Sequence, residues 1–268
     1  MIHETAVIGS EVKLGKNVTV GPFAVIDGPV SIGDECRIGP HCHICGDTSI
    51  GARTKIHAGA VIGDEPQDHG YHDQASSTEI GNDCVIREYV TIHRGSREGN
   101  VTRIGNNAML MGFVHIGHDC QIADRVVIAN NCMIAGHVEI GEKAFLSGAV
   151  AVHQFARIGR LAMIASNQRI SQDVAPFCMV GDEGAIVGPN SVGLRRAGLT
   201  STQRSCLKEA IKTFFFRGLA HEDALIMMQE MYADSAQIAD FIEFVRNSKR
   251  GMLAGNSRQV RLYNPDRD

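Results

Sequence analysis

Four histidines stand at positions that a hydrophobic core would not use. They are His115, His118, His137 and His153. Imidazoles take up and release protons near neutral pH, so clustered histidines indicate general acid–base chemistry. Asp119 follows His118 directly, and a carboxylate in that place can orient and polarise an imidazole base. These residues can act together only if the fold brings distant segments side by side.

Aliphatic residues recur every six positions from Ile8 to Ile170, and 25 of the 28 positions in this series are Ile, Leu or Val. The residue two places earlier is usually small or β-branched, and the residue that follows is often glycine. Alternate side chains of a strand share one face, so both repeat positions point inward. A helix would need a period near 3.6, so the pattern predicts short strands instead.

Three such six-residue segments make one triangular coil, and successive coils stack into a prism. The hexapeptide pattern resembles that of the left-handed β-helix proteins, which is the reason to expect the left hand, since crossover connections ordinarily favour the right. The predicted fold class is an all-β left-handed parallel β-helix with a C-terminal α-helical domain. We expect the β-helix in residues 1–189 and the helical domain in residues 190–268.

A step of three hexapeptides advances one coil at the same position of the prism. His118 then lies over Gly136, and Gly136 lies over Gln154. His137 and His153 are chain neighbours of these residues, so one outer column collects three imidazoles. Gly136 leaves room beside His118 and offers a backbone N–H to a negatively charged reacting oxygen.

Two alternatives compete with this interpretation of the histidines. They can simply decorate a solvated face, or three of them can bind zinc, as in the γ-class carbonic anhydrases. The spacing of His115 and His118 does not resemble the ligand spacing of that family, and Asp119 better suits a base held by a carboxylate. We therefore predict no metal.

The cysteines invite a metal or disulfide interpretation, above all in the segment 41–45 (HCHIC). Their phase argues against it, because Cys42 falls two places before an aliphatic repeat position while Cys45 does not, so the two point different ways. The cysteines in the inward phase are predicted to be small hydrophobic core residues, as suits a reducing compartment. They are Cys36, Cys42, Cys84, Cys120 and Cys132.

The repeat is interrupted twice without a change of phase. The three positions that are not aliphatic, Asp68, Gln74 and Glu98, lie in two polar segments. We expect these segments, residues 64–79 and 94–103, to be loops that leave the prism. Loops on a rigid scaffold are common places for binding groups.

The period vanishes near residue 190. Thr200 followed by Gln203 predicts a capping box that opens a helix, with Leu207, Ile211 and either Phe214 or Phe215 as its buried stripe. Two more helices are expected near residues 221–231 and 235–247, and the final dozen residues are expected to be disordered. This helical region would cover the open end of the prism.

Three basic residues recur at steps of four on the first of these helices: Arg204, Lys208 and Lys212. Such a stripe is either a solvated helix face or a dock for an acidic carrier protein. Overall charge is balanced, with 26 basic and 30 acidic residues, so nothing favours binding to nucleic acid. The chain shows neither a long unbroken apolar run nor a leader pattern, so we expect no membrane span and a cytoplasmic protein.

The chain resembles the UDP-N-acetylglucosamine O-acyltransferase family, which catalyses the first step of lipid A biosynthesis, over nearly its whole length. The segments that carry the resemblance are 86–95 (IREYVTIHRG), 115–120 (HIGHDC), 129–131 (ANN), 135–138 (AGHV), 152–155 (VHQF), 172–176 (QDVAP) and 192–198 (VGLRRAG). Hexapeptides alone indicate only a broad acyltransferase superfamily. The combination of TIHRG, HIxHDC and VHQF is specific.

The resemblance implies a homotrimer with active sites between neighbouring prisms, no metal or organic cofactor, and two substrates. These are a 3-hydroxyacyl group on acyl carrier protein and a UDP-activated amino sugar. His118 would be the general base, Asp119 its orienting partner and the Gly136 N–H the oxyanion donor. Further positions match residues that line the sugar and acyl cleft, or that contact the carrier or the diphosphate: Gln67, Asp68, His115, His137, His153, Gln154, Asn190 and Arg196.

Several positions depart from the family pattern. Gly70 stands where the family has a lysine, so that contact is missing or is replaced by His69 or His72. Val192 replaces an acidic residue of the family pattern, and Ala197 replaces the second arginine of a frequent pair. These two replacements put the diphosphate contacts there in doubt. The segment 165–169 (ASNQR) is bulkier than usual in the acyl groove, where Ser166 and Asn167 lie, and predicts a shorter acyl chain.

Two other functions stay open on the sequence alone. Another hexapeptide acyltransferase, N-acylating or acetyl-CoA-dependent, is one of them. The N-acyltransferase of the same pathway usually carries a globular domain before its repeats, whereas these repeats begin at Ile8. A non-catalytic β-helix scaffold is the other, although it would need no clustered histidines. The acceptor group, hydroxyl or amine at the sugar 3-position, also stays open.

Overall fold

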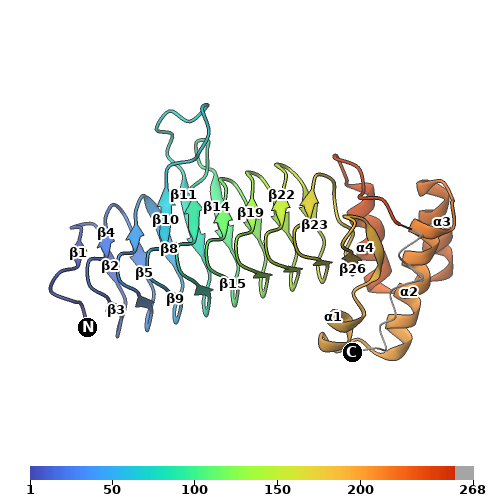
Figure 1. Ribbon diagram of the computed structural model, residues 1–268, viewed down its shortest axis with the longest axis horizontal. Coiled ribbons are helices and arrows are strands. Elements are labelled where there is room, and N and C mark those ends of the chain that lie inside the picture. Colours follow the sequence, from blue (N-terminus) through green and yellow to red (C-terminus); the bar gives the residue numbers. More distant parts are fainter. Residues whose placement is uncertain (257–268) are drawn as a thin grey trace.

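The structure is a computed structural model that describes residues 1–256 of the chain. The disorder expected for the final dozen residues concerns positions outside the described residues. Short strands wind along a prism whose coils follow one another from the N-terminus to a cluster of helices, as Figure 1 shows. The chain forms the expected left-handed parallel β-helix, whose coils follow the hexapeptide repeat.

Three stacked sheets form the faces of the prism. The first face contains β1 (Val7–Ile8), β4 (Val25–Ile26), β7 (His43–Ile44), β10 (Val61–Asp64), β13 (Thr91–His93), β16 (His115–Ile116), β19 (Met133–Ile134), β22 (Ala151–Val152) and β25 (Arg169–Ile170). The second contains β2 (Lys13–Leu14), β5 (Ser31–Ile32), β8 (Asp47–Ile50), β11 (Ser77–Ile80), β14 (Val101–Ile104), β17 (Gln121–Ile122), β20 (Glu139–Ile140) and β23 (Arg157–Ile158). The third contains β3 (Thr19–Val20), β6 (Arg37–Ile38), β9 (Lys55–Ile56), β12 (Val85–Ile86), β15 (Met109–Leu110), β18 (Val127–Ile128), β21 (Phe145–Leu146), β24 (Met163–Ile164), β26 (Cys178–Val180) and β27 (Ile186–Pro189).

The core consists of the two inward positions of each repeat, as expected. Val114 and Ile116, from one repeat, are both fully buried. The five cysteines of the inward phase are buried too, and all eight cysteines are free thiols. The interior is therefore a stack of small and aliphatic side chains, and it leaves the outward positions free to carry function.

Strand register confirms a coil of three hexapeptides and locates the two loops. Val7 pairs with Val25, one such coil further along the chain. Val61 instead pairs with Thr91, and Thr91 with His115, so the first loop adds two hexapeptide lengths to its coil and the second adds one. Because both insertions are whole hexapeptides, the phase survives. The loops span residues 65–76 and 94–100. Asp64 and the segments 77–79 and 101–103, which were expected to be loop, belong to β10, β11 and β14.

In the part of the chain that the structure describes, four helices follow the last strand: α1 (Ser191–Arg196), α2 (Ser201–Phe216), α3 (His221–Met231) and α4 (Ala236–Arg246). The predicted capping box is present at the start of α2, where Thr200 accepts from the Gln203 N–H and Gln203 accepts from the Thr200 N–H. Sequence reasoning missed α1 and the antiparallel pairing of β27 with β26. Within the described residues, no helix combines the length and apolarity needed to cross a bilayer.

The helices cover the end of the prism, and Arg157 of β23 bonds to the last of them. Its guanidinium donates to the carbonyls of Phe244 and Asn247 at 3.2 and 2.8 Å and lies over the Phe244 ring. Helix α2 also packs against β27. The last strand edge is thereby covered rather than exposed, as edge strands require.

Candidate active site

His118 and Asp119 form a buried pair at one corner of the prism. The Nδ1 of His118 lies 2.6 Å from the Asp119 carboxylate, and the exposed fractions of the two residues are 6 % and 8 %. Asp119 adopts a left-handed backbone conformation with φ of 63°, which Asp tolerates better than most residues, and this corner turns both side chains away from the core.

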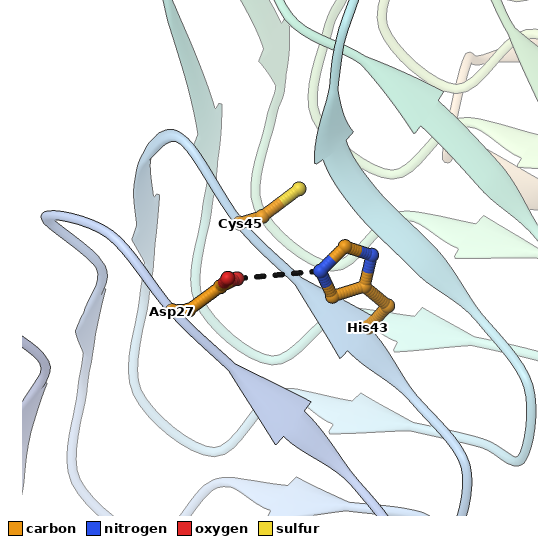
Figure 2. Close-up of side chains that lie close together, drawn as sticks. All are labelled: Asp27, His43 and Cys45. Atoms are coloured by element: carbon orange, nitrogen blue, oxygen red, sulfur yellow. Dashed lines mark hydrogen bonds and ion pairs between the residues drawn. The ribbon is translucent and has the colours of Figure 1, made fainter. Parts of the chain in front are cut away.

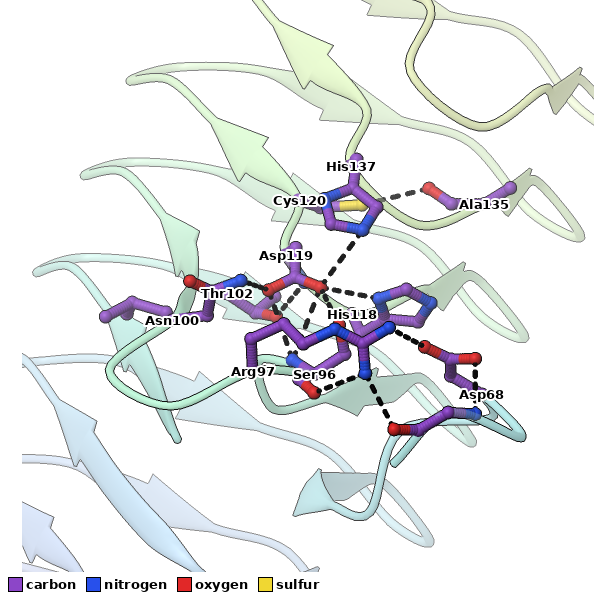
Figure 3. A network of polar contacts seen from close by, with 12 residues as sticks. Asp68, Ser96, Arg97, Asn100, Thr102, His118, Asp119, Cys120, Ala135 and His137 are labelled. Carbon is purple, nitrogen blue, oxygen red and sulfur yellow. Dashed lines mark hydrogen bonds and ion pairs between the residues drawn. The ribbon is translucent and has the colours of Figure 1, made fainter. Parts of the chain in front are cut away.

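The loop 94–100 covers this pair. Ser96 donates to Asp119 through its hydroxyl at 2.6 Å and through its backbone N–H at 3.1 Å, and Asn100 donates its amide at 2.8 Å. The Asp119 N–H in turn donates to the Thr102 hydroxyl. Figure 3 shows these groups converging on one carboxylate. Sequence reasoning missed Ser96, Asn100 and Thr102. The one signal for them was the predicted loop 94–103, which contains all three.

These contacts keep the Asp119 carboxylate ionised. Burial alone would raise the pKa of Asp119, but hydrogen bonds from His118, Ser96 and Asn100 outweigh it and hold that pKa well below its usual range. The carboxylate is therefore ionised near neutral pH, so His118 must donate from Nδ1. Its Nε2 is left with a lone pair that can accept a proton.

His137 lies against the same pair from the next coil. Its ring meets His118 edge to face at 5.1 Å between centroids, and its Nε2 lies 3.4 Å from Asp119. Phe155, one coil further on, stacks on His137 at 4.5 Å. Burial lowers the pKa of His137, and the neighbouring Asp119 opposes that effect.

Gly136 lies directly beside the His118 ring. A Cβ on this residue would stand 2.6 Å from both Cε1 and Nε2 of His118, so only glycine fits. Within residues 1–256, no acceptor bonds to the Gly136 N–H. The predicted superposition of His118 on Gly136 is thus present, and among the described residues the Gly136 N–H has no acceptor.

His115 lies on the adjacent face next to a histidine that sequence reasoning did not select. Its ring is 5.2 Å from that of His93, and its Nδ1 bonds to the Thr91 hydroxyl. His93 is buried and bonds to the Glu65 carbonyl at the base of the first loop. Burial lowers the pKa of His115 to about 4, and the nearby His93 and His118 add to this effect, so His115 is neutral near pH 7.

His153 and Gln154 lie exposed one coil beyond Gly136. The Nδ1 of His153 is 3.2 Å from the Gln154 carbonyl. In the described part of the chain, His153 makes neither a ring contact nor a hydrogen bond with His118 or His137. The predicted column therefore contains one close imidazole pair, with His153 at its edge.

The first loop brings Asp68 toward the site and leaves Gln67 exposed. Asp68 accepts from the Gly70 N–H, which lowers the pKa of its carboxyl, and it lies 3.6 Å from the guanidinium of Arg97. His69 and His72 are exposed on the same loop.

The remaining predicted residues lie nearer the helical end. Asn190 caps α1 by accepting from the Gly193 N–H, and its amide donates to the Leu161 carbonyl, so both ends of its side chain are engaged. Arg196 is exposed at the end of α1, and Ser166 and Asn167 are exposed on the coil of β24 and β25.

Among residues 1–256, two groups of side chains offer metal-ligand atoms within 4.8 Å of one another. One is His118, Asp119 and His137. The other joins Asp27 to His43 and Cys45, with His43 3.3 Å from Asp27 (Figure 2). Cys45 thus faces away from the buried Cys42, as its phase predicted, but next to His43. The prediction that the protein needs no metal stays a prediction.

A cleft of about 650 Å³ opens beside the pair. Asp119, His137 and Phe155 line it together with Lys249 and Arg250, which follow α4. Sequence reasoning did not select these two basic residues. The cleft is large enough for a substrate, and of the predicted catalytic residues Asp119 lines it.

A prism of hexapeptide coils with a buried histidine–carboxylate pair in a cleft defines the class of hexapeptide-repeat acyltransferases. The family model described as bacterial transferase hexapeptide, six repeats, matches residues 29–64 and 102–136. The model described as UDP-N-acetylglucosamine O-acyltransferase, domain 2, matches residues 173–253.

The chain belongs to the family of acyl-[acyl-carrier-protein]–UDP-N-acetylglucosamine O-acyltransferases. It is 42 % identical to the member from Xanthomonas oryzae pv. oryzae over 94 % of this chain and 97 % of that protein. It also resembles the crystal structure of the Francisella novicida UDP-N-acetylglucosamine acyltransferase, with a TM-score of 0.92 and 35 % identity over 98 % of this chain and all of that one. The Bacteroides fragilis structure matches with the same score, at 37 % identity, over 94 % of this chain and all of that one.

Proposed function

We propose that this protein transfers a 3-hydroxyacyl group from acyl carrier protein to the 3-position of UDP-N-acetylglucosamine, the first step of lipid A biosynthesis. The observation that carries the proposal is the buried His118–Asp119 pair beside the bare backbone of Gly136. Family membership supports the substrate pair, because the relatives are named for an acyl carrier protein and this nucleotide sugar.

His118 is the proposed general base. Its Nε2 takes the proton of the sugar 3-hydroxyl while that oxygen attacks the thioester carbonyl. The C–S bond then breaks, and the departing thiolate takes the proton from the imidazolium. Asp119 holds the imidazole with Nδ1 protonated and stabilises the imidazolium that forms.

The Gly136 N–H is the proposed donor to the oxyanion. Charge develops on the thioester oxygen in the transition state, and a fixed donor stabilises it most when it is not already bonded. The missing side chain also lets the carbonyl approach the imidazole closely.

The proposed substrate contacts surround this centre. Asn190, whose side chain is fully engaged, contributes by holding α1 and thus Arg196 in place. The other proposed contacts are Gln67, Asp68, His115, His137, His153 and Gln154.

The acyl groove is proposed to pass Ser166 and Asn167. Gln168 donates from one nitrogen to the carbonyls of Ser166 and Asp182 at 2.9 and 3.1 Å, so the bulkier segment is held in place rather than free to move aside. We therefore expect a shorter acyl chain to be preferred.

The carrier is proposed to dock on the basic stripe of α2. Lys208 and Lys212 are exposed, whereas Arg204 is half-buried and donates to the Leu199 carbonyl. An acidic partner would meet two free ammonium groups there. We place the reaction in the cytoplasm.

A homotrimer is proposed from an exposed aromatic strip along one corner of the prism. Phe23 stacks on His41, and Tyr89 stacks on Phe113, each at 5.2 Å. Between them Gly59 has no side chain, and the Tyr89 ring fills its place. The side chains of Phe23, Tyr89 and Phe113 are 56–58 % exposed, and neighbouring copies of the chain would cover them.

One transfer assay tests the proposal. The purified protein receives a panel of 3-hydroxyacyl carrier proteins of different chain lengths, each with UDP-N-acetylglucosamine or its 3-amino analogue, and mass spectrometry identifies the product. We expect transfer to the hydroxyl acceptor with a shorter chain. Transfer only to the amino analogue would move the assignment to that acceptor, and no transfer with any pair would refute it.

A further inference from the structure

Arg97 crosses from the second loop to the first at the mouth of the site. It donates from Nη1 to the Gly70 carbonyl at 2.7 Å and to the Ser96 carbonyl at 3.3 Å. Its Nη2 lies 3.6 Å from Asp68. In Figure 3 the guanidinium lies between the Asp68 loop and the His118–Asp119 pair.

Gly70 provides the space for this guanidinium. A Cβ at position 70 would lie 3.0 Å from Nη2 and 3.2 Å from Nη1 of Arg97. A side chain on the first loop and the Arg97 guanidinium therefore compete for one volume. Because this chain has glycine at position 70, the positive charge beside the first loop comes from Arg97 of the second loop.

The donors of Arg97 are only partly used. In the described residues no acceptor lies within hydrogen-bond distance of Nε or Nη2, and these atoms form the side-on fork that binds two oxygens of one anion. The side chain is 54 % exposed, so a ligand can reach it. The charge of Arg97 also reaches the catalytic corner. Burial is the largest cause that lowers the pKa of His137, and the positive charge of Arg97 lowers that pKa further.

We infer that Arg97 is a substrate-binding residue that holds the diphosphate of the nucleotide sugar through Nε and Nη2. This inference rests on the proposed function. Asp68 places a carboxylate 3.6 Å from Arg97, so a diphosphate bound at this mouth needs a cation beside it. Arginine suits this role better than lysine because its fork matches two phosphate oxygens.

This assignment replaces the expectation for His69 and His72. Both are exposed on the first loop, whereas Arg97 carries a permanent charge and is held by two carbonyls. Exchanging both histidines for alanine should leave the affinity for the nucleotide sugar unchanged.

Calorimetry with UDP-N-acetylglucosamine tests the inference on five proteins: the unchanged chain, Arg97→Ala, Arg97→Lys, Gly70→Lys and the double variant R97A/G70K. We expect the Kd to rise about 10- to 100-fold in Arg97→Ala, because a charge-assisted contact is lost, and less in Arg97→Lys. The double variant should recover most of the affinity, since a lysine at position 70 enters the vacated volume. Gly70→Lys alone should weaken binding through the clash with Arg97.

Arg53→Ala is the matched control. Arg53 is similarly exposed, at 53 %, and pairs with Asp83 on another corner, so its loss should leave the Kd unchanged. An unchanged Kd in Arg97→Ala would overturn the inference, as would a loss that lysine at position 70 does not restore.

Acyl carrier protein also carries a phosphate, and Arg97 could bind that anion instead of the diphosphate. If Arg97→Ala raised the KM for acyl carrier protein alone, the diphosphate assignment would be wrong. If the unchanged chain bound no nucleotide sugar, the proposed function itself would fail, which differs from a failure of Arg97 only.

Discussion

Among the single residues, the proposed chemistry depends most on a carboxylate that stays ionised. Asp119 accepts four hydrogen bonds from three residues, and two of those residues come from the loop above it. Asp119→Asn keeps the shape but replaces an acceptor oxygen by a donor, so His118 loses its fixed tautomer. We expect kcat to fall about 10²-fold or more, with Tm little changed. Asp27→Asn, outside the cleft, should retain full kcat.

Acid should weaken the fold through His115 before the carboxylates matter. The folded pKa of about 4 lies below the unfolded value near 6.5, so the unfolded chain binds the proton first as pH falls. The free energy of unfolding should therefore drop between about pH 6.5 and pH 4. Urea titrations of the unchanged protein and of His115→Gln measure this; equal pH slopes in the two would contradict it.

The contacts of Asp119 show what a sequence can and cannot provide for individual side chains. The meeting of His118 with Gly136 follows from a step of three hexapeptides, because backbone hydrogen bonds fix the coil repeat. Ser96 and Asn100 could not be placed in this way, since a loop is positioned by its own side-chain contacts. The burial of His118 and Asp119 could not be predicted for the same reason, because that loop covers the predicted outer column at this point.

Among the helices and strands, α2 is the proposed contact for the carrier. The double substitution Lys208→Glu and Lys212→Glu should raise the KM for acyl carrier protein at least severalfold at low salt, with little effect in high salt, because screening removes the attraction. Binding of the nucleotide sugar should not change. The double substitution Lys13→Glu and Lys16→Glu, at the other end of the prism, is the control. If both double variants have the same KM for acyl carrier protein, the basic stripe of α2 is only a solvated helix face.

Elements with a clear period or cap were predictable, and shorter ones were not. The coils and α2 followed from the hexapeptide and from the Thr200 box. The six residues of α1 are too few to show a helical period, and the β26–β27 pairing breaks the parallel pattern where the repeat ends. The predicted loop bounds were also wrong, because β11 and β14 begin two residues earlier along the chain than the two-residue strands of the repeat.

For the molecule as a whole, the exposed aromatic strip should bring copies of the chain together. Phe113→Glu places a charge in that strip and should lower the mass in sedimentation from three chains toward one. Activity should fall in parallel if the site lies between copies. The same substitution at Phe145, on the third face, is the comparison; an unchanged mass for Phe113→Glu would remove the strip from the interface.

The proposed mechanism requires the imidazole of His118 to take the proton during acyl transfer. The decisive experiment is the turnover of purified His118→Ala with the best acyl carrier substrate, beside His57→Ala, a histidine that pairs with Glu88 elsewhere on the prism. We expect a loss of about 10² to 10⁴ in kcat for His118→Ala alone, with binding of the nucleotide sugar retained. Full turnover in a folded His118→Ala protein would contradict the mechanism.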